Sequence, residues 1–477
     1  MTEPDFLSAI RANPDDDTPR LAYAAWFEAN GHPARAELIR LQCELARLPA
    51  WSERRTELLA RSQELLRGEP GQGLGESLAK PDTGATVVCS SLDCGGGLWL
   101  RTQDPFYYGR EPFLELGFRR GFIDEADSDP STFISVADAL VRQTPVRRVW
   151  LRNDGIDILG RVLACEQLRE IPVLALSGHS LRSEGMAVLI DSAGLSHLRG
   201  LELSGNEFTP DDVERLAAAP GAANLEVLEL GPENEGAHWD THNVSNSASD
   251  RGLTAIAGSR YFGNLRRLKL EGNDIGADGV IALAASRHLR NLRELVLDEN
   301  AVGAEGVRAL AGASGLGNLE ILSLCCNQLD ASTAPGMFAG DGLAGLRELN
   351  LAYTSLGDTG VHALAAASQF ARLRVLNLFG CEIGPAGIQA LATCPHFAAL
   401  TSLYLGFNPV DDEGVVHLKG LNELKWLNLS STQVTDAGLV HLRELKGLEW
   451  LNLSSTQVTD LGVAGLKRVL PNVYIQR

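Results

Sequence analysis

Residues 265–273 read Leu-Arg-Arg-Leu-Lys-Leu-Glu-Gly-Asn, and this phrase decides the fold because its pattern, Leu-x-x-Leu-x-Leu-x-x-Asn, recurs along the chain. The full pattern returns at Leu292 and Leu319, and its leucines return from Leu346, Leu373 and Leu400. Each of these steps is 27 residues long. A repeat of constant length predicts a chain of equivalent units in which each unit stacks on the next.

Spacing within one repeat predicts its secondary structure. The last two leucines of the phrase are two residues apart, so they face one side of a strand. After the asparagine, Val280, Leu283 and Ala284 have helical spacing. Burying one leucine contributes roughly 1.5–3 kcal/mol, whereas ordering the backbone costs about 1–2 kcal/mol per residue. Single repeats are therefore unstable alone, and stacking brings the strands together on a concave face with the helices outside.

The phrase resembles the leucine-rich repeat. Repeats of 27 residues, over roughly 145–410, are similar to the ribonuclease-inhibitor-like subclass, and the 24-residue steps from Leu400 to Leu424 and Leu448 resemble shorter bacterial and F-box-associated variants. The expected fold class is α/β, a leucine-rich-repeat solenoid with a curved parallel sheet, preceded by a small all-α module. The resemblance implies binding of another protein.

Four regions are expected from the composition and the periodicity. They are a helical module at 1–48, a helix followed by a linker and β region at 49–117, an N-terminal cap of the solenoid at 118–145, and the repeats at 146–477. The step from Leu225 to Leu265 is 40 residues, and the extra residues fall in a polar insertion at 231–250. Such a composition is typical of an exposed loop.

The first 48 residues contain Asp-Asp-Asp-Thr-Pro-Arg-Leu-Ala-Tyr-Ala-Ala-Trp-Phe-Glu at 15–28 and Glu-Leu-Ile-Arg-Leu-Gln at 37–42. These segments resemble the bacterial repeat-companion domain, a short module found ahead of varied repeat regions. This family commonly has an acidic residue before the tryptophan, where this chain has Ala25. The resemblance implies a context for the module and no chemistry.

Bulk composition favours a cytoplasmic, globular protein. The chain has 477 residues, 44% of them hydrophobic, and a net charge of −19. The negative charge argues against nucleic acid and anionic membranes as partners, and no apolar run is long enough to span a membrane. The first five residues lack the layout of a secretory signal. The eight cysteines contain no Cys-x-x-Cys pair, so free thiols are favoured, with pairing of Cys89 and Cys94 left open.

The register places two kinds of side chain on the concave face. In the middle repeats they are charged: Glu202, Glu229, Lys269, Glu271, Glu294, Asp298 and Glu299. In the later repeats they are aromatic: Tyr353, Phe379, Tyr404, Phe407, Trp426 and Trp450. Aromatic residues are favoured interface anchors, although Trp426 and Trp450 could also simply stack on each other. The acidic part fits either a solvated face or a basic partner.

Catalytic and metal signatures are weak. The insertion holds His238, Asp240 and His242, which are too few ligands to predict a metal site, and Gly95–Gly97 is a turn rather than a phosphate loop. The predicted function is a non-catalytic protein-interaction scaffold without cofactor or metal. The alternatives are a GTPase activator or another regulator acting through the repeat edge, with Arg148 and Arg152 as candidate arginines, or an enzyme activity in the N-terminal region.

Overall fold

The computed structural model describes residues 2–48, 53–67, 88–90, 98–101, 114–120, 122–152, 156–232, 246–329, 334 and 336–477. The chain forms two compact units, Met1–Leu203 and Ser204–Arg477. Both units contain repeats, and each is described by itself. Cys94, Gly95–Gly97, the proposed metal ligands His238, Asp240 and His242, and the Cys89 side chain lie outside what is described.

Unit 1 combines helices with a mixed sheet. Strands β1 to β4 pair antiparallel, whereas β4 to β7 pair parallel. The helices are α1 (Glu3–Ala12), α2 (Thr18–Ala29), α3 (Pro33–Leu45), α4 (Glu53–Arg67), α6 (Pro130–Gln143), α7 (Ile156–Leu163) and α8 (Arg182–Asp191), with short helices η1 (Glu166–Glu170) and η2 (Ala193–His197). The strands are β1 (Val88–Ser90), β2 (Leu98–Arg101), β3 (Leu114–Arg119), β4 (Phe122–Ser128), β5 (Arg148–Leu151), β6 (Val173–Ala175) and β7 (Gly200–Glu202).

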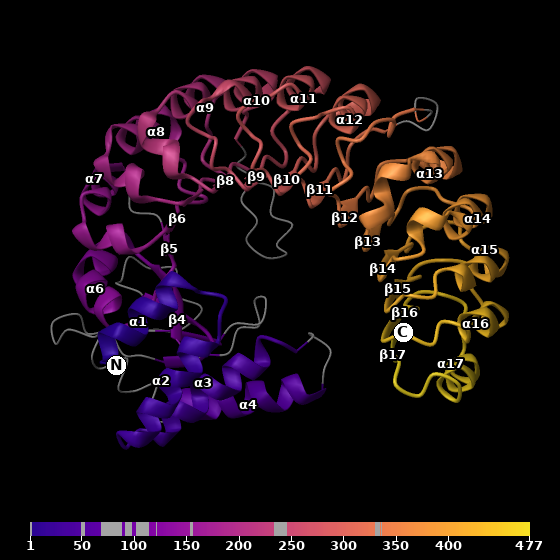
Figure 1. Ribbon diagram of the computed structural model, residues 1–477, viewed down its shortest axis with the longest axis horizontal. Coiled ribbons are helices and arrows are strands. Elements are labelled where there is room, and N and C mark those ends of the chain that lie inside the picture. Colours follow the sequence, from indigo (N-terminus) through magenta and orange to yellow (C-terminus); the bar gives the residue numbers. More distant parts are fainter. Residues whose placement is uncertain are drawn as a thin grey trace. The chain divides into compact units, whose positions relative to one another are not determined.

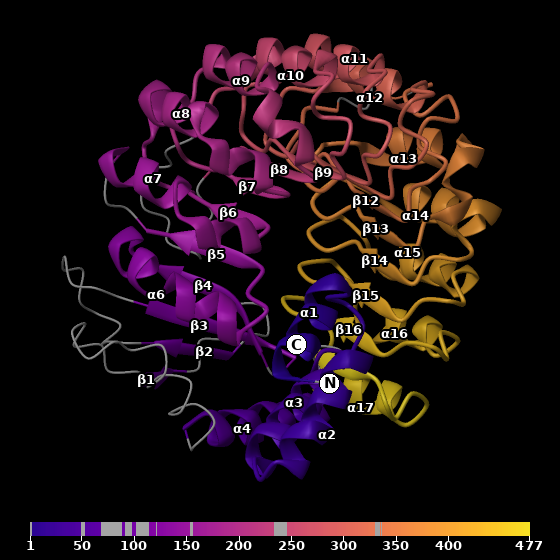
Figure 2. The ribbon, with the colours of Figure 1, turned by 60° about the vertical axis from the view of Figure 1, so that its left-hand side comes forward.

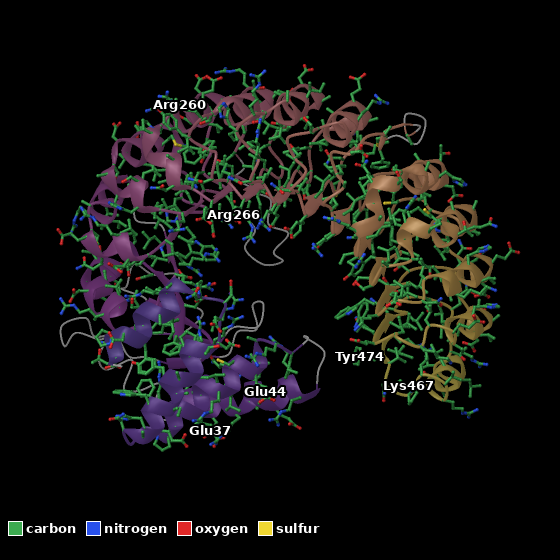
Figure 3. All side chains as sticks on the ribbon, in the orientation of Figure 1. Glu37, Glu44, Arg260, Arg266, Lys467 and Tyr474 are labelled. Atoms are coloured by element: carbon green, nitrogen blue, oxygen red, sulfur yellow. The ribbon has the colours of Figure 1, made fainter. Side chains whose placement is uncertain are left out.

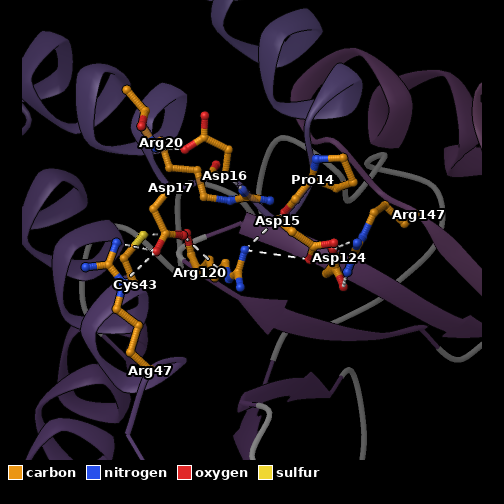
Figure 4. A network of polar contacts seen from close by, with 11 residues as sticks. Pro14, Asp15, Asp16, Asp17, Arg20, Cys43, Arg47, Arg120, Asp124 and Arg147 are labelled. Carbon is orange, nitrogen blue, oxygen red and sulfur yellow. Dashed lines mark hydrogen bonds and ion pairs between the residues drawn. The ribbon is translucent and has the colours of Figure 1, made fainter. Parts of the chain in front are cut away.

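The N-terminal helices pack directly on the start of β4. The ring of Phe122 joins the buried cluster of α1 to α3, with its centroid 5.6 Å from that of Tyr23. A polar network also links the helices to Arg120, which follows β3 (Figure 4): Arg47 Nη2 lies 2.7 Å from Asp17 Oδ2, and Arg120 donates to the Pro14 carbonyl at 3.2 Å. Since Asp17 is buried, its pairing with Arg47 satisfies a charge that burial would otherwise destabilise.

Unit 2 carries parallel strands on the inner side of an arc and helices on the outer side (Figure 1). The strands are β8 (Val227–Glu229), β9 (Arg267–Lys269), β10 (Glu294–Val296), β11 (Ile321–Ser323), β12 (Glu348–Asn350), β13 (Val375–Asn377), β14 (Ser402–Tyr404), β15 (Trp426–Asn428), β16 (Trp450–Asn452) and β17 (Tyr474–Gln476). The helices are α9 (Pro210–Ala217), α10 (Ser249–Gly258), α11 (Ala277–Ala284), α12 (Gly303–Ala311), α13 (Gly357–Ala366), α14 (Pro385–Thr393), α15 (Asp412–His417), α16 (Asp436–Leu442) and α17 (Asp460–Lys467), with η3 (Pro220–Asn224), η5 (Ser368–Arg372), η6 (Pro395–Phe397) and η7 (Leu418–Gly420).

The leucines of the phrase form the core of unit 2, as the spacing predicts. Leu268, Leu295 and Leu322 pair side by side along the sheet, and all three are fully buried. Figure 2 shows the strands β12 to β16 in sequence beside the helices that cover them. One repeat differs from the expected strand–helix pattern: its described residues between β11 and β12 form turns, where Gly336 and Gly340 have φ of 73° and 139°. Such angles interrupt a helix.

The asparagines at the end of the phrase hold the turns. Asn300 donates to the carbonyls of Leu270 and Leu297 at 2.8 and 3.0 Å. Its Oδ1 accepts from the amides of Asn273 and Ile275 in the preceding repeat, so one buried amide satisfies backbone groups of two repeats. In three later repeats a threonine takes this position, and the Thr354 hydroxyl donates to the carbonyl of Leu351 at 2.6 Å and contacts the Cys381 thiol at 3.7 Å.

The last two repeats share one further contact. Thr435 donates to Asp412 through both its amide, at 2.8 Å, and its hydroxyl, at 2.6 Å. Thr459 donates to Asp436 in the same way, at 2.7 and 2.6 Å. Residues 427–436 and 451–460 have the same sequence, and each copy uses the same contact to hold the helix that follows it.

Candidate interaction surface on the sheet of unit 2

Pairing of the parallel strands arranges the side chains of the concave face in rows. The first residue of each strand stands beside the first residue of the next, as in Glu294 beside Ile321. Along unit 2 this first row contains Val227, Arg267, Glu294, Ile321, Glu348, Val375, Ser402, Trp426, Trp450 and Tyr474. The residues in these rows divide the face into two segments that differ in chemistry.

The acidic segment comprises the charged residues of β8 to β10 and the turns after β9 and β10, and its charges pair with one another. Lys269 Nζ lies 3.0 Å from Glu229 Oε1, and Arg267 Nε lies 2.6 Å from Glu294 Oε2. Asp298 accepts hydrogen bonds from the Ser323 hydroxyl at 2.6 Å and the Cys325 amide at 2.7 Å. Much of the expected acidic surface is therefore neutralised within the protein.

Burial changes the ionisation of two of these acids. It raises the pKa of Glu271 to about 7, and the nearby carboxylates of Asp298 and Glu229 add to the rise. Burial also raises the pKa of Asp298, against the hydrogen bonds from Ser323 and Cys325, which lower it. Glu299 lies beyond β10 and is exposed, whereas Glu202 belongs to unit 1, where it is buried and pairs with Arg148.

Tyr353, Phe379 and Phe407 form an edge row in the turns that follow β12, β13 and β14. Ring centroids lie 5.4 Å apart between Tyr353 and Phe379, and 6.0 Å apart between Phe379 and Phe407. The rings are close because Gly380 and Gly406 leave room: a Cβ at Gly380 would lie 2.7 Å from Tyr353 Cδ1. Sequence register places Tyr353 and Phe407 on strands, but the three-residue strands end before them.

Two residues of the edge row have an unusual backbone. Tyr353 has φ of 55° and Phe407 has φ of 59°, in the left-handed region. The same position of the other repeats is also left-handed, whether it holds glycine, as at Gly272 and Gly380, or another residue, as at Glu299, Cys326, Ser431 and Ser455. For a bulky residue this conformation costs roughly 1–2 kcal/mol per residue. Tyr353 is nevertheless 50% exposed and Phe407 62% exposed, so burial does not offset this cost. Because the turn of the repeat imposes this conformation, it is the exposure of two large aromatic rings, and not the backbone angle, that points to a role outside folding.

Trp426, Trp450 and Tyr474 form a second aromatic group, the strand row, at the first positions of β15, β16 and β17. The two indole centroids lie 5.5 Å apart with the ring planes tilted by 32°, so the rings contact each other without stacking in parallel. Tyr474 extends the row by one strand and is 51% exposed (labelled in Figure 3). Sequence analysis missed Tyr474, which is not among the aromatic residues that it places on the concave face.

A pocket of about 240 Å³ lies on the same face between the acidic segment and the strand row. Its lining side chains come from neighbouring strands and include Ile321, Ser323, Glu348, Asn350, Val375, Asn377 and Tyr404. Burial and the nearby Glu294 raise the pKa of Glu348, and burial together with Glu348 raises the pKa of Tyr404. The sequence analysis did not identify Glu348 as a site residue. A signal was present in the sequence, because its neighbours in the first row, Ile321 and Val375, are uncharged and cannot pair with its carboxylate.

The two candidate arginines of unit 1 are engaged in ion pairs. Arg148 pairs with Glu202 and lies 3.9 Å from Glu125, and Arg152 Nη2 lies 2.6 Å from Asp127 Oδ2. Neither guanidinium is thus an unpaired finger for a phosphate. Within the described ranges, no group of three or more His, Cys, Asp or Glu residues could hold a metal ion, and no helix could cross a membrane.

Comparison with known proteins supports the repeat assignment. Leucine-rich-repeat family profiles match residues 194–217, 264–284, 288–311, 346–365, 373–392 and 398–458. The repeats are leucine-rich repeats. No curated protein matches the chain in sequence.

Solved leucine-rich-repeat structures resemble the chain at low identity. An internalin from Listeria monocytogenes has 22% identity and a TM-score of 0.44, over 67% of this chain and 87% of its own. A TLR13 complex with single-stranded RNA has 18% identity and a TM-score of 0.40, over 67% of this chain and 41% of its own. A leucine-rich-repeat protein of Leptospira interrogans has 16% identity and a TM-score of 0.36, over 73% and 92%.

Proposed function

We propose that unit 2 binds a protein partner through the edge row and the strand row. The observation that carries this proposal is the pair Tyr353 and Phe407, large aromatic side chains of the edge row that are 50% and 62% exposed. Side chains of this kind contribute a large apolar area at a low cost in conformational entropy when they become buried in an interface. Leucine-rich repeats generally act in protein–protein interaction, which agrees with this use of the face.

The strand row supports the same proposal. Trp426 and Trp450 are only partly buried, although their rings contact each other. This contact does not exclude a binding role, because both indoles keep exposed area and Tyr474 beside them is 51% exposed. Tryptophan and tyrosine are the residues most enriched among interface anchors. The assignment of the N-terminal helices to a repeat-companion module and of the repeats to the ribonuclease-inhibitor-like subclass stays part of the proposal.

The test is affinity capture from a native lysate with the full chain and with two pairs of variants. Tyr353→Gly/Phe407→Gly removes the strained aromatic residues, and Trp426→Ala/Trp450→Ala removes the indoles. Each double variant is expected to bind the partner at least tenfold more weakly than the wild type, since an anchor contributes about 2 kcal/mol or more. Leu461→Ala is the control, because Leu461 is 84% exposed on the outer helix α17.

Stability measurements separate binding from folding. Tyr353→Gly relieves the strain but loses a ring contact and adds flexibility, so the free energy of unfolding should change by less than about 1 kcal/mol. A partner retained equally by the wild type and both double variants, with all proteins folded, would exclude the aromatic rows as the binding surface.

A further inference from the structure

The pocket on the concave face contains an acid that has no partner. Glu348 is partly buried at the first position of β12, between Ile321 and Val375 on the neighbouring strands. Among the residues that the structure describes, its carboxylate makes no ion pair or hydrogen bond. Glu294, in the same row, differs because its carboxylate pairs with Arg267 at 2.6 Å. Glu348 is thus poised to accept a cation from outside the chain.

Further polar groups converge on the same space. The Tyr404 hydroxyl and the Asn377 side-chain amide also line the pocket, and neither the hydroxyl nor Asn377 Nδ2 has a hydrogen-bond partner within the described parts of the chain. Asn377 Oδ1 accepts from the Phe379 amide at 3.1 Å, which fixes the orientation of the amide group. The carboxylate and the hydroxyl offer acceptors to a planar group that has several donors, whereas Asn377 Nδ2 is itself a donor and needs an acceptor.

The walls of the pocket select among cations. Ile321 and Val375 present apolar side chains on both sides of Glu348, and the Tyr404 ring lies on the next strand, β14. A guanidinium is planar, is more weakly hydrated than an ammonium, stacks on aromatic faces and pairs with carboxylates through two donors. The volume of about 240 Å³ is large enough for one long side chain.

We propose that the Glu348 pocket accepts an arginine side chain of the partner protein. This inference rests on the proposed function, since it requires that a protein occupies the concave face. The guanidinium donates to the Glu348 carboxylate and to Tyr404 Oη, and its methylene groups lie between Ile321 and Val375. The partner would then present one arginine flanked by apolar residues that contact the edge row.

The pocket can be tested without the partner. Full-length protein with labelled Ile and Val methyl groups is titrated with Nα-acetyl-arginine amide, and the signals of Ile321 and Val375 are followed by NMR. We expect saturable shifts that the neutral analogue Nα-acetyl-citrulline amide does not produce. Glu348→Gln should weaken the arginine affinity at least about tenfold, as expected for loss of a charged hydrogen-bond partner. Glu299→Gln, on an exposed acid after β10, should leave it unchanged.

Several outcomes would overturn the inference. They are no shift at Ile321 and Val375, equal shifts with citrulline, equal affinity in Glu348→Gln with an unchanged unfolding midpoint, or tighter binding of Nα-acetyl-lysine amide. The result is independent of the capture experiment on the aromatic rows. If the arginine analogue fails while the aromatic variants lose the partner, only the pocket assignment is wrong.

Discussion

The acidic segment and the two aromatic rows are built on the same leucine scaffold but leave different surfaces. In the acidic segment, neighbouring strands carry opposite charges in the same row, as in Arg267 beside Glu294, so the charges neutralise each other. From β12 onward Glu348 is followed in the first row by aromatic or neutral residues, and it has no opposite charge beside it. Charged groups of the acidic segment thus pair within the chain, whereas the part of the face from β12 onward leaves groups to which a partner can bind.

The largest expected difference concerns the turns: a substitution in a turn of the acidic segment should lower the free energy of unfolding more than one in a turn of the aromatic part. Asn300→Ala removes an amide that satisfies backbone groups of two repeats and leaves the buried amides of Asn273 and Ile275 unpaired. We expect a loss of about 3 kcal/mol in the free energy of unfolding. Thr354→Val removes one neutral hydrogen bond, to Leu351, and should cost about 1 kcal/mol. Urea denaturation with hydrogen exchange of β10 and β12 measures both, and equal losses would contradict the difference.

The partly buried Glu271 of the acidic segment should make stability depend on pH. Because the folded pKa of Glu271 is about 7, above the value near 4.5 expected when unfolded, the folded state binds an extra proton between these values. Stability should therefore fall as the pH rises from about 4.5 to 7. Glu271→Gln removes the group whose ionisation causes this loss. At pH 8 the free energy of unfolding of the variant should therefore exceed that of the wild type by on the order of 2 kcal/mol.

A matched acid keeps this test specific. Glu305 lies exposed on the outer helix α12, and Glu305→Gln should follow the wild-type pH profile. Urea unfolding between pH 4.5 and 8 supplies the comparison. If Glu271→Gln shows the same slope as the wild type, Glu271 titrates at its ordinary value and is not buried as described.

The smallest effect belongs to the ion pairs of the acidic segment. Arg267 and Glu294 are partly exposed, and such pairs contribute about 0.2–1 kcal/mol. Arg267→Gln should lose this amount at low salt and nothing at 1 M NaCl, because salt screens exposed charges. Arg287→Gln, at an exposed position outside the strands, is the control. A loss that persists at 1 M NaCl would indicate packing rather than charge.

Much of the fold could be predicted because the repeat determines it. The spacing of Leu265, Leu268 and Leu270 predicted the strand, the buried face and the stacking, and Asn273 and Asn300 hold the turns. The surface was harder to predict. Tyr353 and Phe407 lie past the strand ends because the strands are only three residues long, which a period of two cannot reveal.

The pairing of charges also escaped the sequence analysis. Side chains 27 residues apart become neighbours only when the strands are aligned, so Arg267 beside Glu294 and Glu348 beside Val375 have to be read across repeats. The regions assigned to 1–48, 49–117 and 118–145 stay predictions as domain boundaries. In unit 1 the helices of the first region pack on Phe122, within the third.

The contact from Thr435 to Asp412 and its copy from Thr459 to Asp436 have a consequence for the history of the chain. Each threonine joins its repeat to the repeat before it, and each repeat carries the aspartate that the following one needs. A duplicated 24-residue segment therefore carries both the threonine that contacts the repeat before it and the aspartate that the repeat after it contacts. Unequal crossing-over within the gene can lengthen or shorten this end of the array by whole repeats, and every junction between the remaining repeats is preserved.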